Sequence, residues 1–307
     1  MKRIPQRPGV LRLLKFLPAL VLLLSSAAAS AQASAGFDFP PATFNILDAK
    51  TSKVIGFVRY SIGPIDDSGL QTVSGDEHYL DGEHDVERDV VQNRGTDKMP
   101  LMVTFEHDFY NADGSIARVS AANFRTGDAS CTVYTNGHRT VLSDTLDFPS
   151  DTYAGAIVEL PMQAGLRNGS NGPISLHAFN CIPGPKVIKI AAYPQAPSAW
   201  THYAGETVEV SVKPDFGWLN FVVAPFMPEF RAWFNPASQW QFVGARFTRF
   251  YKGPEIILAY VPAGSGGNEA PPAAPSPPQL EQAERSPASI SALHDDSGAT
   301  ASRLPTQ

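Results

Sequence analysis

Alternation of apolar and polar residues through the middle of the chain is the feature that most limits its fold. In LMVTFEHDFY, residues 101–110, one face collects four large apolar side chains and His107, while the other is mostly polar. A period of two is typical of a half-buried β-strand, because successive side chains point to opposite faces. ETVEVSV at residues 206–212 repeats the pattern. The chain is therefore predicted to be mainly β.

Further strands and turns extend this pattern over most of the chain. Strands are expected at residues 53–60, 79–91, 116–124, 131–135, 138–142, 186–192, 218–224, 242–251 and 255–261. Asn136 and Gly137 suit a two-residue hairpin turn, which needs positive φ at both positions. EIILAYV, the last of these strands, is apolar on both faces and is expected to lie centrally. The predicted fold is a curved antiparallel meander or incomplete β-barrel.

One segment has helical rather than strand spacing. The sequence around residues 151–167 offers Ser150 or Asp151 as an N-cap, followed by apolar residues at helical intervals and by Gly169 as a stop. Pro161 is expected to end or kink the helix, because proline lacks the backbone N–H that a helix interior uses. One central helix is therefore predicted within the sheet.

The two ends of the chain differ from its middle. Residues 1–33 combine five basic residues with the apolar stretch FLPALVLLL and small residues, the pattern of a cleaved signal peptide. Residues 262–307 are rich in Pro, Ala, Ser and Gly without an aromatic residue, a composition typical of a disordered tail. A single β-rich domain is expected over residues 34–261.

Charge and export narrow the range of partners. The net charge is -6, and it becomes -11 without the five basic residues of the leader. Such an acidic chain repels phosphate backbones, so nucleic-acid binding is excluded as a function. The leader is too short to span a bilayer and no later segment comes closer, so no transmembrane segment is expected after its removal. A periplasmic or secreted location is predicted.

The two cysteines, Cys131 and Cys181, are predicted to form a disulfide, because paired thiols of an exported protein are usually oxidised. Two free buried cysteines are the main alternative. A catalytic cysteine is disfavoured, since no CxxC motif or obvious histidine partner accompanies either residue.

The stretch YLDGEHDVERDVV at residues 79–91 concentrates charge as a metal or catalytic site would. As a strand it places Glu83, Asp85, Glu87 and Asp89 on one face, about 7 Å apart along it, which is too far for neighbours to close on one ion. The favoured interpretation is a solvent-facing acidic strand that resists unwanted pairing. The alternative is a metal-binding module, with His78 or His84 meeting a ligand from a neighbouring strand.

Sequence motifs for catalysis are missing. The chain has no GxSxG elbow, phosphate-binding glycine loop, SxxK motif or HExxH motif, so no catalytic residue, metal ligand or cofactor is assigned. His107 is interpreted as a hydrogen-bonded core histidine. A hydrolase with a dispersed Ser/His/Asp site remains an alternative, because catalytic triads are defined by geometry and not by spacing in the sequence.

Residues 216–251 hold an unusual share of the aromatic residues. They are most simply interpreted as core. The functional alternative is an apolar groove or its mouth. Its candidate residues are Phe226, Met227, Phe230, Trp233 and Phe234. Such a groove would hold a lipid or another apolar small molecule, or contact an envelope protein.

Three longer stretches carry a family resemblance: GDEHYLDGEHDVERDVV, FEHDFYNADGSIARVSAANFRTGDASC and WQFVGARFTRFYKGPEIILAYV. Together they resemble uncharacterised exported β-rich proteins of Gram-negative bacteria, and more distantly the half-barrels of periplasmic lipoprotein carriers. The resemblance implies a concave apolar face that holds acyl chains and a helix near 151–167 that covers it. It implies no catalytic residues, so a non-enzymatic binding role is expected.

Overall fold

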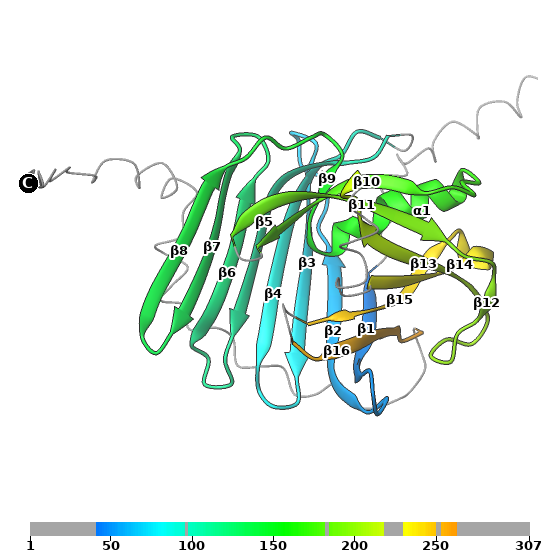
Figure 1. Cartoon of the computed structure of the whole chain (residues 1–307), viewed down its shortest axis with the longest axis horizontal. Coiled ribbons are helices and arrows are strands. Elements are labelled where there is room, and N and C mark those ends of the chain that lie inside the picture. The colour runs from blue at the N-terminus through cyan, green and yellow to red at the C-terminus, as the bar shows by residue number, and fades with distance from the viewer. Residues whose placement is uncertain (1–40, 96–97, 182–183, 218–229, 250–252, 263–307) are drawn as a thin grey trace, which may run out of the picture. The chain divides into compact units, whose positions relative to one another are not determined.

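A computed structural model describes residues 41–95, 98–181, 184–217, 230–249 and 253–262. The predicted leader, most of the predicted tail and the predicted strand at 218–224 lie outside these residues. The described chain forms one sixteen-stranded sheet with a short helical segment (Figure 1). None of the described helices is long and apolar enough to cross a membrane.

The first half of the sheet is a simple meander in which each strand pairs antiparallel with the next. Its strands are β1 (Ala42–Asp48), β2 (Val54–Ile62), β3 (Leu70–Tyr79), β4 (His84–Gln92), β5 (Leu101–Tyr110), β6 (Ile116–Asn123), β7 (Asp128–Thr135) and β8 (His138–Thr145). Asn136 and Gly137 join β7 to β8 with φ of 51° and 76°, which confirms the predicted turn. The sheet order ends at β8.

The second half returns along the other side of β1, in the order β16, β15, β14, β13, β11, β10, β9. Its strands are β9 (Thr152–Tyr153), β10 (Ile174–Cys181), β11 (Pro185–Pro194), β12 (Ser198–Ala199), β13 (Glu206–Pro214), β14 (Phe230–Asn235), β15 (Gln241–Thr248) and β16 (Glu255–Tyr260). β16 lies between β1 and β15, so the apolar segment EIILAYV is central, as predicted. β9 pairs with β10 in parallel, and the other strand pairs are antiparallel.

The helical segment starts later than the sequence predicts. A 3-10 turn, η1 (Gly155–Val158), leads into α1 (Glu159–Arg167), and neither has a side-chain cap, so the predicted N-cap at residue 150 or 151 is wrong. Pro161 falls in the first turn of α1, where backbone N–H groups have no helical partner, and the helix continues through it. Gly169, with φ of 72°, follows the helix end as predicted.

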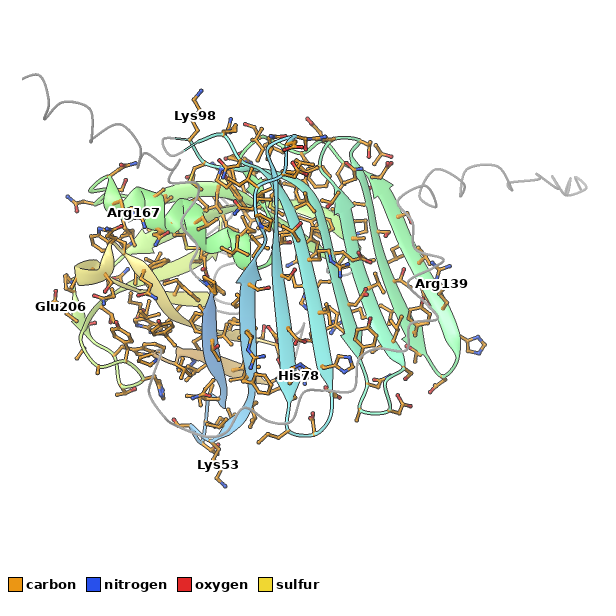
Figure 2. The ribbon with its side chains drawn as sticks, turned by 180° about the vertical axis from the view of Figure 1, so that it is seen from behind. Lys53, His78, Lys98, Arg139, Arg167 and Glu206 are labelled. Atoms are coloured by element: carbon orange, nitrogen blue, oxygen red, sulfur yellow. A yellow bond between two sulfur atoms is a disulfide. The ribbon has the colours of Figure 1, made fainter. Side chains whose placement is uncertain are left out.

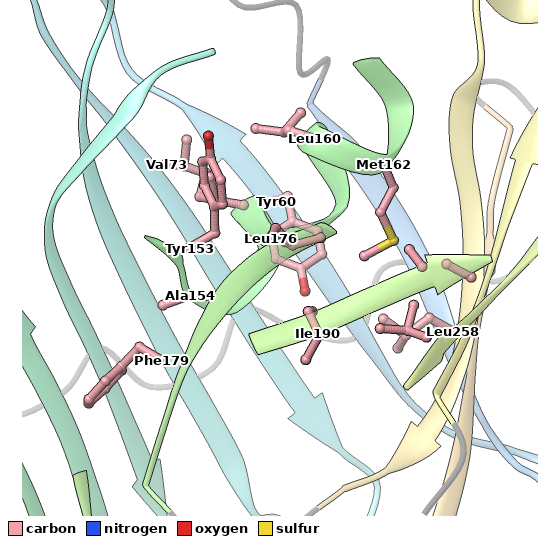
Figure 3. Close-up of a cluster of buried hydrophobic side chains, with 14 of the residues drawn as sticks. Tyr60, Val73, Tyr153, Ala154, Leu160, Met162, Leu176, Phe179, Ile190 and Leu258 are labelled. Atoms are coloured by element: carbon pink, nitrogen blue, oxygen red, sulfur yellow. The ribbon is translucent and has the colours of Figure 1, made fainter. Parts of the chain in front are cut away.

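The sheet curls so that one face of both halves lines the same core. This inner face carries Val73 of β3, Leu176 of β10 and Leu258 of β16, and Leu160 of α1 packs among them (Figure 3). The rings of Phe105 in β5 and Phe179 in β10 lie 5.8 Å apart. The described sheet is open, because β8 and β9, at the two ends of its path, do not pair. The predicted fold class is confirmed.

The predicted disulfide joins Cys131 in β7 to Cys181 at the end of β10, with a Cα–Cα distance of 5.6 Å. These strands are far apart in the sheet order and lie near its two ends. The bond therefore holds the two ends of the curled sheet together.

A smaller core lies on the opposite, outer face. Trp200 and Trp233 stack there with ring centroids 4.4 Å apart, and Leu47, Val243 and Ile257 pack around them. Strands β14 to β16 are consequently buried on both faces.

Candidate ligand-binding site

The acidic face of β4 points into the protein. Strand parity places Asp85, Glu87 and Asp89 on one face, as the sequence predicts, but their relative exposures are 2%, 9% and 0%. The prediction of a solvent-facing acidic strand is therefore wrong. Burial follows from the curl of the sheet, which brings η1 over β4, so that the backbone N–H of Ala156 donates to Glu87 Oε1 at 2.7 Å.

Neighbouring strands add polar groups to this face. Glu77 of β3 lies opposite Asp85, and His107 of β5 lies opposite Glu87. Residues directly opposite in an antiparallel pair share a face, with Cβ atoms about 4.5–5.5 Å apart. Glu77, Asp85, Glu87 and Asp89 are named here the inner acidic site.

Arg249, just after β15, reaches this site from the second half of the sheet. Its guanidinium carbon lies 3.4 Å from the ring centroid of Tyr79, and Nη1 lies 2.7 Å from Glu83 Oε2. The Nη2 atom is 3.8 Å from Asp85 Oδ1, beyond hydrogen-bond distance. A planar cation is thus held between an aromatic ring and carboxylates.

Arg118 of β6 provides a second positive charge beside the site. Its guanidinium carbon lies 4.1 Å from the ring centroid of Phe109, which is opposite Asp85 in the sheet register. Both Arg118 and Phe109 are partly exposed, so this end of the inner face can be reached from solvent.

Burial shifts the protonation of the site strongly. It raises the pKa of Glu77 to about 8, and the charge of Asp85 adds to the effect. Burial also raises the pKa of Asp85 to about 7, although Arg249 and Arg118 oppose the change. Tyr79 donates a hydrogen bond from its hydroxyl to Glu77 Oε2 at 3.0 Å. Both carboxyl groups therefore change charge near neutral pH.

The deepest member of the site is Asp89. Among the described residues its oxygens accept no hydrogen bond from an N–H or hydroxyl donor. The group that reaches them is the carboxyl of Glu87, which shares a hydrogen bond with Asp89 when one of the two is protonated. Burial, together with the charge of Glu87, raises its pKa well above the ordinary value, and burial also raises the pKa of Glu87. Burial and the charge of Glu87 also raise the pKa of Glu159 in α1. Glu87 and Asp89 thus cannot both be charged at neutral pH without a cation beside them.

Asp85 retains an unsatisfied oxygen at the more open end of the site. Its Oδ1 atom is buried and accepts no hydrogen bond from a described residue. Buried carboxylate oxygens normally have a donor, so this atom marks a place where a donor group of a ligand would fit.

His107 faces the site but is not hydrogen-bonded as expected. Its Nδ1 lies 3.8 Å from Glu87 Oε2, and Nε2 is buried without a partner in the described structure. Burial lowers the pKa of His107 to about 3, so this ring is neutral at physiological pH.

His78 and His84 lie on the outer face, away from the acids. Their rings form the middle of a stack that runs from Phe57 to Tyr110 across β2, β3, β4 and β5, with centroid separations of 5.1, 6.0 and 4.4 Å. His78 Nε2 also lies 2.9 Å from Asp76 Oδ1. The described residues hold no group of three or more side chains that could bind a metal ion, so the structure gives the metal-binding hypothesis no support.

The hydrolase alternative likewise lacks an assembled site. His177 Nδ1 lies 2.8 Å from Asp151 Oδ1, which makes a His–Asp pair. Among the described residues, no Ser, Thr or Cys side chain forms a hydrogen bond with His177 or His78, so these residues assemble no triad around either histidine.

The five apolar candidates do not share one surface. Phe226 and Met227 lie outside the described residues. Phe230 and Phe234 face the inner core, where Phe234 is 0% exposed, whereas Trp233 faces the outer core and stacks on Trp200. Strand parity in β14 therefore separates Trp233 from its neighbours, and ligand binding by these residues stays a prediction.

Four members of the site environment were not singled out from the sequence: Glu77, Tyr79, Arg118 and Arg249. Glu77 and Tyr79 could have been found, because a turn centred on Asp81 places Glu77 opposite Asp85. Arg249 has no such signal, since its approach depends on the curl of the whole sheet.

Comparisons with known proteins were made for the sequence and for the fold. No family model and no curated protein matches the sequence. Among solved structures, the chain is similar to a β-barrel-like protein of Domain of Unknown Function DUF1849 from Brucella abortus. The TM-score is 0.42 and the identity 8%, with 72% of this chain and 94% of that chain covered. This similarity names no ligand and no activity.

Proposed function

We propose that this chain is an exported, non-enzymatic binding protein that holds a small organic cation at the inner acidic site. The observation that carries the proposal is the buried, unsatisfied Oδ1 of Asp85 beside Glu77. An ammonium or guanidinium group would supply the missing hydrogen-bond donor and would add a positive charge to those of Arg118 and Arg249.

The electrostatics of the site favour a cation over other ligands. Four carboxyl groups line it, and the cations that the described structure places against Asp85 are Arg118 and Arg249. Arg249, stacked on Tyr79 and paired with Glu83, shows that the site already accommodates a planar cation. An anionic ligand would be repelled by the excess of acid.

An acyl chain fits the described inner face less well. Phe234, Ile157 and Met162 are each 0% exposed in its core, because η1 and α1 pack against the sheet there. These three residues offer no surface to an acyl chain, but Phe230 and Phe247 beside this core are partly exposed, so the lipid binding implied by the resemblance stays a prediction. Contact with an envelope partner remains a prediction.

Export is part of the proposal because the protein contains a disulfide. Cys131 and Cys181 are bonded, and disulfides persist mainly in oxidising compartments. A binding protein outside the cytoplasm would meet its ligand at the pH of that compartment, where Glu77 and Asp85 titrate.

Isothermal titration calorimetry with 1,4-diaminobutane tests this function, and 1,4-butanediol serves as its uncharged counterpart. At pH 8.5 we expect saturable 1:1 binding of the diamine and no binding of the diol. The affinity should fall as the pH is lowered through about 8 and about 7, the pKa values of Glu77 and Asp85, by up to tenfold per pH unit for each carboxyl group that must lose a proton to bind the diamine.

The variants Asp85→Asn and Asp76→Asn separate specific from general attraction. Asp76 lies in the same hairpin but on the outer face, with a side-chain exposure of 51%. Asp85→Asn should weaken diamine binding at least tenfold, and Asp76→Asn should leave it unchanged. Equal binding by both variants, or equal binding of the diol, would refute the proposal. Circular dichroism confirms that each variant is folded.

A further inference from the structure

The edge strand β8 is exposed along its whole length. All eight residues of β8 are exposed, and within the described residues β8 pairs with β7 alone. Arg139 marks this edge in Figure 2. The opposite end of the sheet differs, because β9 has two residues and both are buried. β8 therefore offers a long row of backbone groups that a further strand can pair with.

β8 lacks the bulge, the proline and the lysine that often protect a sheet edge. Its pairing with β7 has no bulge, from the pair Thr135–His138 at the turn to the pair Asp128–Thr145 at the other end. It contains no proline and no lysine. Val141 and Leu142 at its centre are 41% and 44% exposed. Edge strands of this kind pair readily with other strands.

The sequence of β8 is complementary to itself in one antiparallel register. A two-fold axis perpendicular to the sheet keeps each side chain on its own face, so only residues of equal parity can lie opposite each other. With Val141 opposite Val141 of the second copy, His138 lies opposite Asp144 and Thr140 opposite Leu142. Arg139 then lies opposite Ser143, and no like charges meet.

The next register of the same length is less complementary. It centres on Leu142 and places Asp144 opposite Thr140 and Arg139 opposite Thr145. Asp144 then faces a threonine in place of the His138 ring, while Arg139 faces a small hydroxyl residue in either register. The pairing of His138 with Asp144 therefore favours the register centred on Val141.

We infer that β8 pairs with β8 of a second copy of this chain, in the antiparallel register centred on Val141, so that the sheet continues across a dimer. The occupant is a second copy because the strand matches itself in parity, brings no like charges together and places the ring of His138 opposite the carboxylate of Asp144, with which an imidazole N–H can hydrogen-bond. This inference is independent of the ligand site, which lies on β3 and β4.

Cysteine cross-linking tests both the pairing and its register. Val141→Cys places two thiols opposite each other across the axis, within the Cα–Cα range that a disulfide allows. Leu142→Cys is the matched control, because its exposure is similar but its copies are offset by two residues along the strands, beyond that range. Under mild oxidation we expect covalent dimers of Val141→Cys and not of Leu142→Cys.

Sedimentation velocity of the full chain gives the second readout. A dimer is expected at about 100 µM, a concentration suited to a modest interface. Val141→Lys should convert the dimer to a monomer, because it places like charges face to face, whereas Val54→Lys at an equally exposed site on β2 should not. A monomeric wild type, or equal cross-linking of both cysteine variants, would overturn the inference.

Discussion

Glu87 and Asp89 lie two residues apart on the same inner face of β4, and burial raises the pKa of both carboxyl groups. Two buried carboxyl groups at this separation cannot both be ionised near neutral pH. Their protonation therefore couples the stability of the fold to pH.

Stability should fall as the pH rises above the ordinary pKa of a carboxyl group. A group whose pKa is raised in the folded state binds more protons when folded, so its stabilisation is complete below the unfolded pKa and is lost as the pH passes the folded pKa. For Glu77 and Asp85 these folded values are about 8 and about 7. Urea unfolding should give a higher free energy of unfolding at pH 5 than at pH 8.5.

The variant Asp89→Asn should flatten this dependence, since asparagine resembles the protonated acid. Each proton that is bound on folding contributes about 1.4 kcal/mol per pH unit, and the variant should remove up to that amount from the slope. Asp76→Asn on the outer face is the control and should keep the wild-type slope. An unchanged slope in Asp89→Asn would contradict a role of this pair.

Removal of the disulfide should destabilise the protein by about 4 kcal/mol, the loop-entropy value for cysteines 50 residues apart. The double variant Cys131→Ser, Cys181→Ser can be compared with wild type in urea unfolding, with and without reductant. Hydrogen exchange should increase mainly in β7, β8 and β10, because the bond joins the ends of the sheet. Equal stability of the oxidised wild type and the variant would contradict this account.

Gly244→Ala should disrupt the outer core. A Cβ at Gly244 would meet the backbone oxygen of Leu258 and the ring of Trp200, which stacks on Trp233. The expected loss is about 1–3 kcal/mol, the usual cost of overpacking, with a change in tryptophan fluorescence. Gly172→Ala, at a position with no neighbour within 4 Å, is the matched control and should have little effect.

The sequence predicts several strands whose two faces differ, although β3, whose burial also alternates, is not among them. β5 and β13 show clear alternation, and both are present. β14 was not predicted, because Trp233 and Phe234 are both buried, on opposite faces, and a strand that is apolar on both faces has no period of two. The contact of β1 with β16 depends on the whole chain and has no local signal.

The candidate site shows what the alternation of side chains along a strand can and cannot predict. Alternation correctly groups Asp85, Glu87 and Asp89 on one face but does not say which face is buried. The usual rule that charged faces are exposed gave the wrong answer. What decides the matter is η1, whose Ala156 donates to Glu87 across 69 positions in the sequence. Long-range packing of this kind cannot be read from the stretch itself.

The pairing of β1 with β16 has a consequence for how the chain folds. β1 to β8 can form from successive hairpins, in which each strand meets a neighbour made shortly before it. The seam between the two halves joins Phe44 to Tyr260 and therefore needs strands from opposite ends of the described chain. Such long-range closure is slow compared with hairpin formation. The meander can thus exist before the sheet is complete, and β16, the last of the described strands in the sequence, is the one that joins its two halves.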